Sequence, residues 1–309
     1  MKNRSTVVCY IILFFAFFSS CTPSTDTDDE IIWVATTSIV ADAVKNIGGE
    51  KVKVISLMGH GVDPHLYKAV KSDLDWLQKA DIIFYNGLHL EGKMTEVLEK
   101  LSKSKKVIAF SDGVPTSKLR KPTPNANVYD PHIWFDVQLW KSAISDVSVQ
   151  IQKTDTANAA YYALNTSAYL MKLDSLDAYV RSKINSIPEG QRMLITAHDA
   201  FGYFGAAYNM DVKGLQGIST VSEYGIQDVM QLVNFIIEKK VPAVFVETSV
   251  SAKSIEAVIE GCRKRGHKVK QGGTLYSDAL GPENSEANTY IGMVKKNVDT
   301  IVNAFKYTE

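Results

Sequence analysis

Residues 155–187 read DTANAAYYALNTSAYLMKLDSLDAYVRSKINSI, and this stretch decides how the rest of the chain is organised. It contains neither Pro nor Gly, and its apolar residues recur mainly in steps of three or four, as on one stripe of an α-helix. The stripe consists of Tyr162, Tyr169, Leu173, Leu176, Val180 and Ile184. Thr154 or Asp155 can cap its start, and Pro188 with Gly190 can end it. The helix would be about 50 Å long, so we interpret it as a rigid spine between two lobes.

Strand and helix patterns alternate on both sides of this stretch. The predicted strands are 31–35, 52–58, 81–86, 107–110, 192–197, 243–247 and 268–272, with a short extended piece at 215–219. The predicted helices are 38–46, 68–78, 92–101, 135–151, 201–208, 226–239, 252–265 and 287–305. Such alternation is typical of βαβ units and mainly parallel sheets. The sequence therefore predicts an α/β fold in which lobes 31–154 and 188–309 are joined by one long linker helix, 155–187.

The N-terminus has the features of an export signal. Lys2 and Arg4 precede an apolar run, residues 7–18, which is followed by Ser19 and Ser20. The run is short for a transmembrane helix, which needs about 20 apolar residues. We therefore predict that residues 1–20 are a signal peptide.

Cys21 directly follows this signal, at a position that resembles a lipobox, in which the cysteine becomes the lipidated first residue of a bacterial lipoprotein. Phe18 departs from the usual Leu of that motif. Residues 21–30 are polar and acidic without periodicity, so they are expected to be a flexible, lipid-anchored tether.

The balance of charges argues against a nucleic-acid binder, and the cysteine content argues against an internal disulfide. Lys plus Arg number 34 and Asp plus Glu also number 34, so the basic excess that is typical of nucleic-acid binders is missing. Of the three cysteines, Cys9 lies in the signal and Cys21 at its end, which leaves Cys262 without a partner for an internal disulfide. Cys262 is expected on a helix face, with a catalytic nucleophile as the alternative.

Three of the six histidines stand in similar contexts at the ends of predicted strands or in loops. His65 lies in GVDPHLYK, His132 in YDPHIWFD and His198 in LITAHDAFGYF, and Asp278 follows the 268–272 segment. Ligands of open α/β sheets bind beside the carboxyl ends of strands. Three imidazoles and a carboxylate are a suitable set for a divalent ion, zinc above all. Spacing alone leaves a structural role open, because no local signature such as HExxH occurs.

Eight motifs then point to one family. They are GVDPHLYK, NGLHLEG, DPHIWFD, TAHDAFGYF, GISTVSEYGIQDV, VFVETSV, LYSDALG and TYIGMVKKNVDTIV. From about residue 31 to the C-terminus the chain resembles the TroA-like (cluster A-I) metal-binding lipoproteins of ABC-type zinc and manganese uptake systems. The resemblance implies two α/β lobes joined by a single helix, with the metal between them. The family's ligand positions match His65, His132, His198 and Asp278.

The resemblance also implies a function. The chain would be an extracytoplasmic receptor, anchored to a bacterial membrane through Cys21, that delivers Zn²⁺ or Mn²⁺ to an ABC permease. It would be a monomer that has no enzymatic activity and does not bind nucleic acid. Many dedicated zinc receptors of the family carry a His-rich loop in the stretch that corresponds to residues 113–131, which contains no histidine here. The chain therefore looks closer to the branch that binds zinc, manganese or both. The three nitrogen ligands, in contrast, favour zinc over manganese.

Other polar residues could support the ligands. Metal-bound imidazoles usually donate their second N–H to a carboxylate, carbonyl or water. The candidate partners are Asp63, Asp130, Asp199 and Glu247, for each of which a turn, a cap or a solvated charge is an equal alternative. We expect a supporting or structural role for His89 and a surface position for His267. His60 is expected to be an idle loop residue, with a transient capture group for the metal as the alternative.

Other functions remain open on the sequence. A lipid-anchored adhesin could carry the same ion as a structural metal. A zinc hydrolase would usually keep only three protein ligands and an open position for water. A receptor for organic solutes or iron chelates would share the helix-linked lobes but would not need this ligand set. If the ion is bound by neutral imidazoles, affinity should fall below about pH 6.5.

Overall fold

The computed structural model describes residues 30–306. The predicted signal peptide and Cys21 lie outside the described residues, as does the predicted tether apart from Glu30.

The first lobe is built on a four-stranded parallel sheet of order β2-β1-β3-β4. Its strands are β1 (Ile32–Thr37), β2 (Lys53–Met58), β3 (Ile82–Tyr85) and β4 (Lys106–Ala109). The helices around it are α1 (Ser38–Gly48), α2 (Lys71–Lys79), α3 (Thr95–Leu101) and α4 (Val137–Thr154). Trp33 and Ala35 of β1 pack into one hydrophobic cluster with α1 and α4, and Val34 packs into another with α2 and α3. Both faces of the sheet are therefore covered, as is usual for parallel sheets.

The second lobe repeats this arrangement with two parallel strand pairs. β5 (Met193–His198) pairs with β6 (Asp211–Gln216), and β7 (Ala243–Glu247) pairs with β8 (Lys270–Leu275). Its helices are α6 (Gly202–Tyr208), α7 (Ile226–Lys239), α8 (Lys253–Lys264) and α9 (Tyr290–Lys306). α7 and α8 pack on one side of these strands, against Ile195 and Val244, and α9 packs on the other, against Phe245. The predicted α/β class with two lobes and parallel sheets is confirmed.

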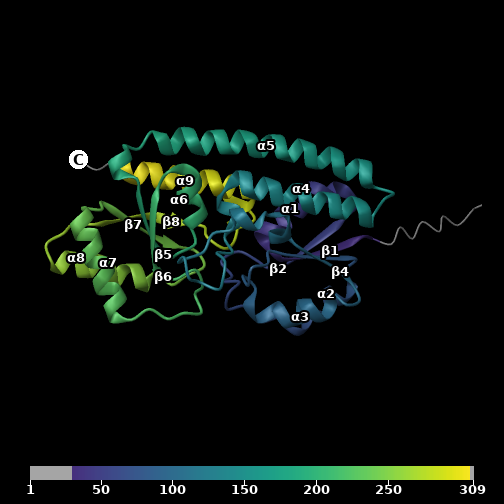
Figure 1. Ribbon diagram of the computed structural model, residues 1–309, viewed down its shortest axis with the longest axis horizontal. Coiled ribbons are helices and arrows are strands. Elements are labelled where there is room, and N and C mark those ends of the chain that lie inside the picture. Colours follow the sequence, from purple (N-terminus) through teal and green to yellow (C-terminus); the bar gives the residue numbers. More distant parts are fainter. Residues whose placement is uncertain (1–29, 307–309) are drawn as a thin grey trace, which may run out of the picture. The chain divides into compact units, whose positions relative to one another are not determined.

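Helix α5 (Ala159–Asn185) runs along both lobes (Figure 1). Its 27 residues span about 40 Å. All six residues of the predicted stripe are buried. Tyr169 donates a hydrogen bond to Asp42 of α1, and Tyr179 donates one to Asp299 of α9, so the same helix is fixed to the first helix of the fold and to the last. The exact lobe boundaries stay predictions.

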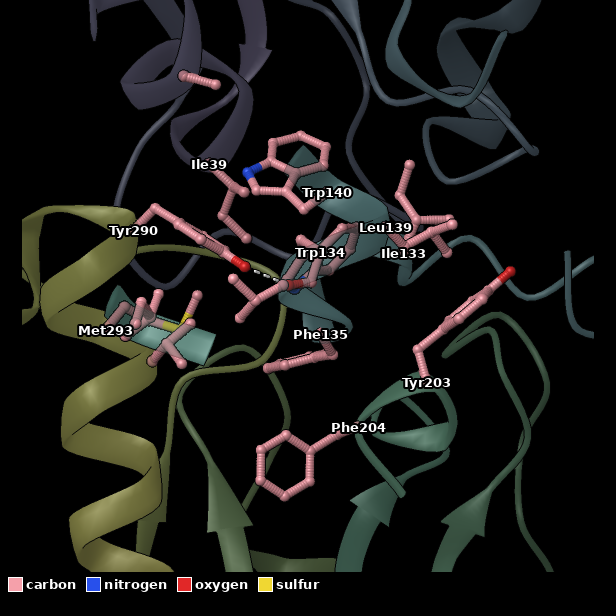
Figure 2. Packing of buried hydrophobic residues seen from close by; sticks show 14 of the residues in the cluster. Ile39, Ile133, Trp134, Phe135, Leu139, Trp140, Tyr203, Phe204, Tyr290 and Met293 are labelled. Carbon is pink, nitrogen blue, oxygen red and sulfur yellow. Dashed lines mark hydrogen bonds between the residues drawn. The ribbon is translucent and has the colours of Figure 1, made fainter. Parts of the chain in front are cut away.

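An aromatic core continues from one lobe into the other (Figure 2). Trp134 lies in the 3-10 turn η5 (Ile133–Phe135), and its backbone carbonyl accepts a hydrogen bond of 2.6 Å from the Tyr290 hydroxyl of α9. The Trp134 indole N–H donates to the Ser277 carbonyl at 3.0 Å. Phe135 packs against Phe201 in a tilted arrangement, with ring centroids 4.3 Å apart. These two buried hydrogen bonds join Trp134 of the first lobe to Ser277 and Tyr290 of the second lobe, and they hold the chain segments around Trp134 and Ser277 close together.

Several predicted boundaries were displaced, for local reasons. α5 begins at Ala159 rather than Asp155, because α4 continues to Thr154 and the Asp155 carboxylate accepts a hydrogen bond from the Asn158 backbone. α2 begins at Lys71 rather than residue 68, because the Asp73 carboxylate accepts from the Val70 backbone N–H and holds that residue extended. Of the piece expected at 215–219, only residues 215–216 are strand, as the end of β6, which starts at Asp211, two residues after the left-handed Asn209 that ends α6. Residues 92–94 and 286–288 form 3-10 turns, so α3 and α9 are shorter than predicted.

Candidate metal centre

Four side chains from four different loops or strand ends meet between the two lobes. His65 follows β2 and His132 directly precedes η5, so these two come from the first lobe. His198 is the last residue of β5, and Asp278 follows β8 in the second lobe. The expectation that these residues lie at the carboxyl ends of strands is met for His65, His198 and Asp278.

The candidate ligand atoms are close enough to share one ion. One atom from each of the four residues lies within 4.8 Å of all the others. The His132 Nε2 and the Asp278 Oδ1 are 3.4 Å apart, and the His198 Nε2 and the Asp278 Oδ2 are also 3.4 Å apart. Tetrahedral zinc with bonds of about 2.0–2.2 Å places its ligand atoms roughly 3.3–3.6 Å from one another. The spacing therefore suits a small divalent ion.

Burial makes these atoms chemically unusual. The exposed fraction is 2% for His65, 0% for His132 and His198 and 1% for Asp278. The Nε2 atoms of the three histidines and the Asp278 Oδ1 are buried and have no hydrogen-bond partner. Burying a polar atom without a partner costs free energy, and such atoms are rare in folded proteins. A metal ion bound by all four would satisfy them together.

Two carboxylates orient the imidazoles of His132 and His198. The His132 Nδ1 lies 2.7 Å from the Asp130 Oδ1, and the His198 Nδ1 lies 2.6 Å from the Glu247 Oε2. Each contact fixes the ring so that its Nε2 faces the other ligands, as is usual around protein-bound metals. Of the four predicted partners, Asp130 and Glu247 are thus in contact with a ligand ring.

The other two predicted partners behave differently. Asp63 accepts a hydrogen bond from the backbone N–H of His65 at 2.9 Å rather than from its ring. Burial raises the pKa of Asp199, but within residues 30–306 no hydrogen bond joins its carboxylate to a ligand ring. The ring of His65 is consequently the least constrained of the three.

Sequence reasoning missed two hydroxyl groups that support Asp278. The Ser249 hydroxyl donates to the Asp278 Oδ2 at 2.9 Å, and it is 2.8 Å from the Ser277 hydroxyl. Ser249 comes two residues after Glu247, which ends β7, so an alternating strand pattern would have placed both on the same side of the chain. Ser277 gave no signal of its own beyond its place next to Asp278.

A glycine lets two strands of the second lobe meet at His198. β6 runs beside the end of β5, where the Gln216 carbonyl accepts a hydrogen bond from the backbone N–H of Asp199. A Cβ atom at Gly214 would collide with the backbone of His198 and Asp199. Any larger residue there would push β6 away and shift the ligand.

The protonation of the three imidazoles differs because their neighbours differ. Burial, reinforced by the other two imidazoles, lowers the pKa of His65 to about 3. Burial also works against a charged His132, but its hydrogen bond to Asp130 and the nearby Asp278 carboxylate outweigh this and raise its pKa to about 9. For His198, Glu247 and Asp278 likewise overcome burial and raise the pKa well above the usual range.

The carboxylate of the site shows the opposite shift. Burial alone would raise the pKa of Asp278, yet His198 and His132 hold it well below its usual range. At neutral pH the metal-free site therefore holds protons on His132 and His198 and a negative charge on Asp278. An incoming cation has to displace those protons.

The remaining histidines lie outside the cluster. His60 is not an idle loop residue as expected, because its Nδ1 lies 3.0 Å from the Leu280 carbonyl of the other lobe. His267 is half-buried, with its Nε2 3.1 Å from the Val241 carbonyl, so the expected surface position is only partly correct. His89 is exposed, in a loop where its φ of 63° is left-handed. Cys262 is buried in α8, as expected for a helix-face residue, and burial raises the pKa of its thiol.

Comparisons with known proteins find close relatives of this chain. The manganese-binding lipoprotein MntA of Bacillus subtilis (strain 168) is 48% identical over 279 residues, which cover 90% of this chain and 91% of that protein. The zinc-binding protein TroA of Treponema pallidum (strain Nichols) is 47% identical over 277 residues, covering 90% and 89%. The solved structure of the periplasmic zinc-binding protein TroA from Treponema pallidum matches with a TM-score of 0.87 at 46% identity, over 89% of this chain and 99% of that one.

The family itself is identified from most of the chain. Residues 34–304 match the family described as zinc-uptake complex component A, periplasmic (ZnuA). This range includes both sheets, α5 and all four candidate ligands. MntA and TroA are close relatives of this chain, which therefore belongs to the ZnuA family of metal-binding solute receptors.

Proposed function

We propose that this chain is the extracytoplasmic receptor of an ABC importer, and that it binds one Zn²⁺ or Mn²⁺ ion between its lobes and delivers it to a membrane permease. The proposed ligands are His65, His132, His198 and Asp278. The single observation that carries the proposal is the convergence of four buried polar atoms that lack hydrogen-bond partners. Relatives named as metal ABC transporter substrate-binding lipoproteins, such as SsaB of Streptococcus sanguinis, support the role in import.

The choice of metal follows from the donor atoms rather than from the relatives. MntA is named for manganese and TroA for zinc, and their identities to this chain are 48% and 47%. Three imidazoles favour zinc, and zinc also binds a given nitrogen and oxygen site more tightly than manganese does. We therefore propose that zinc binds more tightly in vitro, while the metal supplied to the cell decides which ion is transported.

Membrane attachment and assembly complete the proposal. Cys21 would carry the lipid anchor, with residues 21–30 as the tether, and would hold the receptor to a bacterial membrane in the periplasm or at the cell surface. Within the described part of the chain no helix is long and apolar enough to cross a bilayer. The receptor would act as a monomer.

The geometry also supports transport over hydrolysis. A catalytic zinc usually keeps three protein ligands and one open position for water. Here four buried protein ligands are available, and their exposed fractions are 2% or less. A bound ion would be surrounded by protein, which suits capture and delivery and leaves no position for an activated water.

Release of the ion would need small movements. Ligands come from both lobes, so a shift of one lobe or loop removes donors from the ion. Helix α5 is packed against α1 and α9 at separate points, which limits opening of the lobes. Docking to the permease would favour a conformation with fewer ligands in place.

Metal analysis of the purified chain tests the proposal. The protein is isolated from its native host grown with defined zinc and manganese supply, and its metal is measured by mass spectrometry. One equivalent of zinc or manganese per chain, exchangeable without unfolding, is expected. A metal that leaves only on unfolding would favour the structural role of an adhesin.

A further inference from the structure

A cavity of about 340 Å³ adjoins the proposed metal centre. Of the four proposed ligands, His65 alone lines it; the first lobe also contributes His89, and the second lobe contributes residues of the 217–222 segment. The ligands His132, His198 and Asp278 have exposed fractions of 0–1%. Because the cavity reaches the cluster only at His65, an ion that enters or leaves through it has to pass this imidazole.

One wall of the cavity is formed by residues 217–219 and 222, which belong to the segment Gly217–Gly225 that connects β6 with α7. This segment buries little apolar surface, since the exposed fraction of Val221 is 56% and that of Ile226, directly after it, is 81%. Apart from the Gly217 carbonyl, which accepts the Asp199 N–H, its backbone hydrogen bonds are local, for example from the Ser222 N–H to the Ser219 carbonyl. Segments with few buried apolar contacts open at a small cost in free energy.

A side-chain hydrogen bond ties this segment to the first lobe. The Thr220 hydroxyl donates a hydrogen bond of 2.6 Å to the Asp63 Oδ2. Within residues 30–306 it is the one hydrogen bond that runs from Gly217–Gly225 to the first lobe. The other oxygen of the same carboxylate, Oδ1, accepts the backbone N–H of His65 at 2.9 Å. Asp63 therefore connects the wall of the cavity with the backbone of a proposed ligand.

We propose that the hydrogen bond between Thr220 and Asp63 is a latch that closes the ion's passage past His65. While it is made, the segment Gly217–Gly225 covers the cavity, and Asp63 holds the backbone of His65 in place. When this hydrogen bond breaks, the wall moves away and the passage opens. At the same time Asp63 becomes free to shift, so His65 loses the support of its backbone. Asp63 and Thr220 are thus positioning residues, and their role rests on the proposed metal binding.

The test compares the rate of zinc release from Thr220 variants. Zinc-loaded protein is mixed with an excess of a fluorescent zinc chelator, and release is followed by stopped flow. Thr220→Val keeps the size of the side chain but removes the donor. Since hydrogen bonds to charged groups are strong, release should be about ten-fold faster or more. Thr220→Ser retains the hydroxyl and should release zinc at the wild-type rate.

Two further variants exclude a general loosening of the fold. Thr274→Val makes the same chemical change at an exposed position of β8 and should leave the rate unchanged. In an Asp63→Ala background, Thr220→Val should add no further acceleration, because its acceptor is already gone.

The latch is refuted if Thr220→Val releases zinc at the wild-type rate, if Thr220→Ser accelerates release equally, or if the effects of Asp63→Ala and Thr220→Val simply multiply. Failure of the proposed function would look different, since the wild-type protein would then bind no zinc at all.

Discussion

The carboxylate of Glu247 holds His198 at two points. Its Oε2 lies 2.6 Å from the imidazole Nδ1, and its Oε1 accepts the backbone N–H of the same residue at 2.9 Å. Glu247 ends β7 and His198 ends β5, so the contact also joins the two strand pairs of the second lobe where both point at the site. Backbone and ring of the ligand are thereby fixed together.

Replacing this carboxylate should weaken metal binding without unfolding the protein. In Glu247→Gln one oxygen remains to accept a hydrogen bond, but the charge that supports the imidazole is lost. Loss of such a supporting group typically costs roughly 10–100-fold in metal affinity. Calorimetry with zinc measures it, and Glu256→Gln, on an exposed position of α8, is the matched control. Equal affinities of both variants and the wild type would contradict this role.

Metal affinity should continue to rise up to a higher pH than the sequence suggested. The expected decline below about pH 6.5 assumed an unperturbed imidazole. The pKa of His132 is raised to about 9 by Asp130 and Asp278, so its proton is present at pH 7 and must leave when metal binds. His198 is shifted in the same direction. Affinity should therefore increase between pH 7 and pH 9 and fall steadily below pH 7.

Proton release gives a direct measure of this linkage. Zinc titrations at pH 7 in buffers of different ionisation enthalpy should show release of roughly two protons per ion. Binding without proton release, and affinity that is flat from pH 7 to pH 9, would show that His132 and His198 are neutral in the metal-free protein.

The buried stripe of α5 should contribute strongly to stability. Leu173 is 0% exposed in the stripe, whereas Leu164 on the same helix is 70% exposed. Leu173→Ala should lower the free energy of unfolding by about 2–5 kcal/mol, as usual for a buried leucine. Leu164→Ala should change it by less than about 0.5 kcal/mol. Urea denaturation of the metal-free protein compares them, and equal losses would mean that this face of α5 does not hold the lobes together.

Removal of metal should destabilise the wild-type chain but not a variant that lacks a ligand. A ligand that binds only the folded state stabilises it by about 2.7 kcal/mol when its concentration is 100 times the dissociation constant. Thermal unfolding with and without a chelator should therefore differ clearly for the wild type and hardly at all for His132→Ala. A chelator-dependent shift of the same size in His132→Ala would exclude it as a ligand.

Much of the fold was predictable, because it depends on patterns that are local in the sequence. The apolar stripe from Tyr162 to Ile184 gave α5, and α7 and β7 have the predicted boundaries. Errors arose where a side chain or turn decided the boundary. The Asp73 carboxylate sets the start of α2, and the left-handed Asn209 sets the start of β6.

The candidate site was predictable only in part. His65, His132, His198 and Asp278 were selected from their motifs, and the structure brings them together. The contacts that support them join residues far apart in the sequence. Ser249 to Asp278 and His60 to Leu280 are examples, and Thr220 to Asp63 is another. No periodicity encodes such pairs, because they depend on how the two lobes pack.

A crystal structure of the zinc-loaded protein, with anomalous diffraction recorded at the zinc edge, tests the central claim most directly. The account predicts one anomalous peak about 2.0–2.2 Å from the Nε2 atoms of His65, His132 and His198 and from an oxygen of Asp278. A zinc ion held elsewhere, or one that omits the ligands of either lobe, would contradict it.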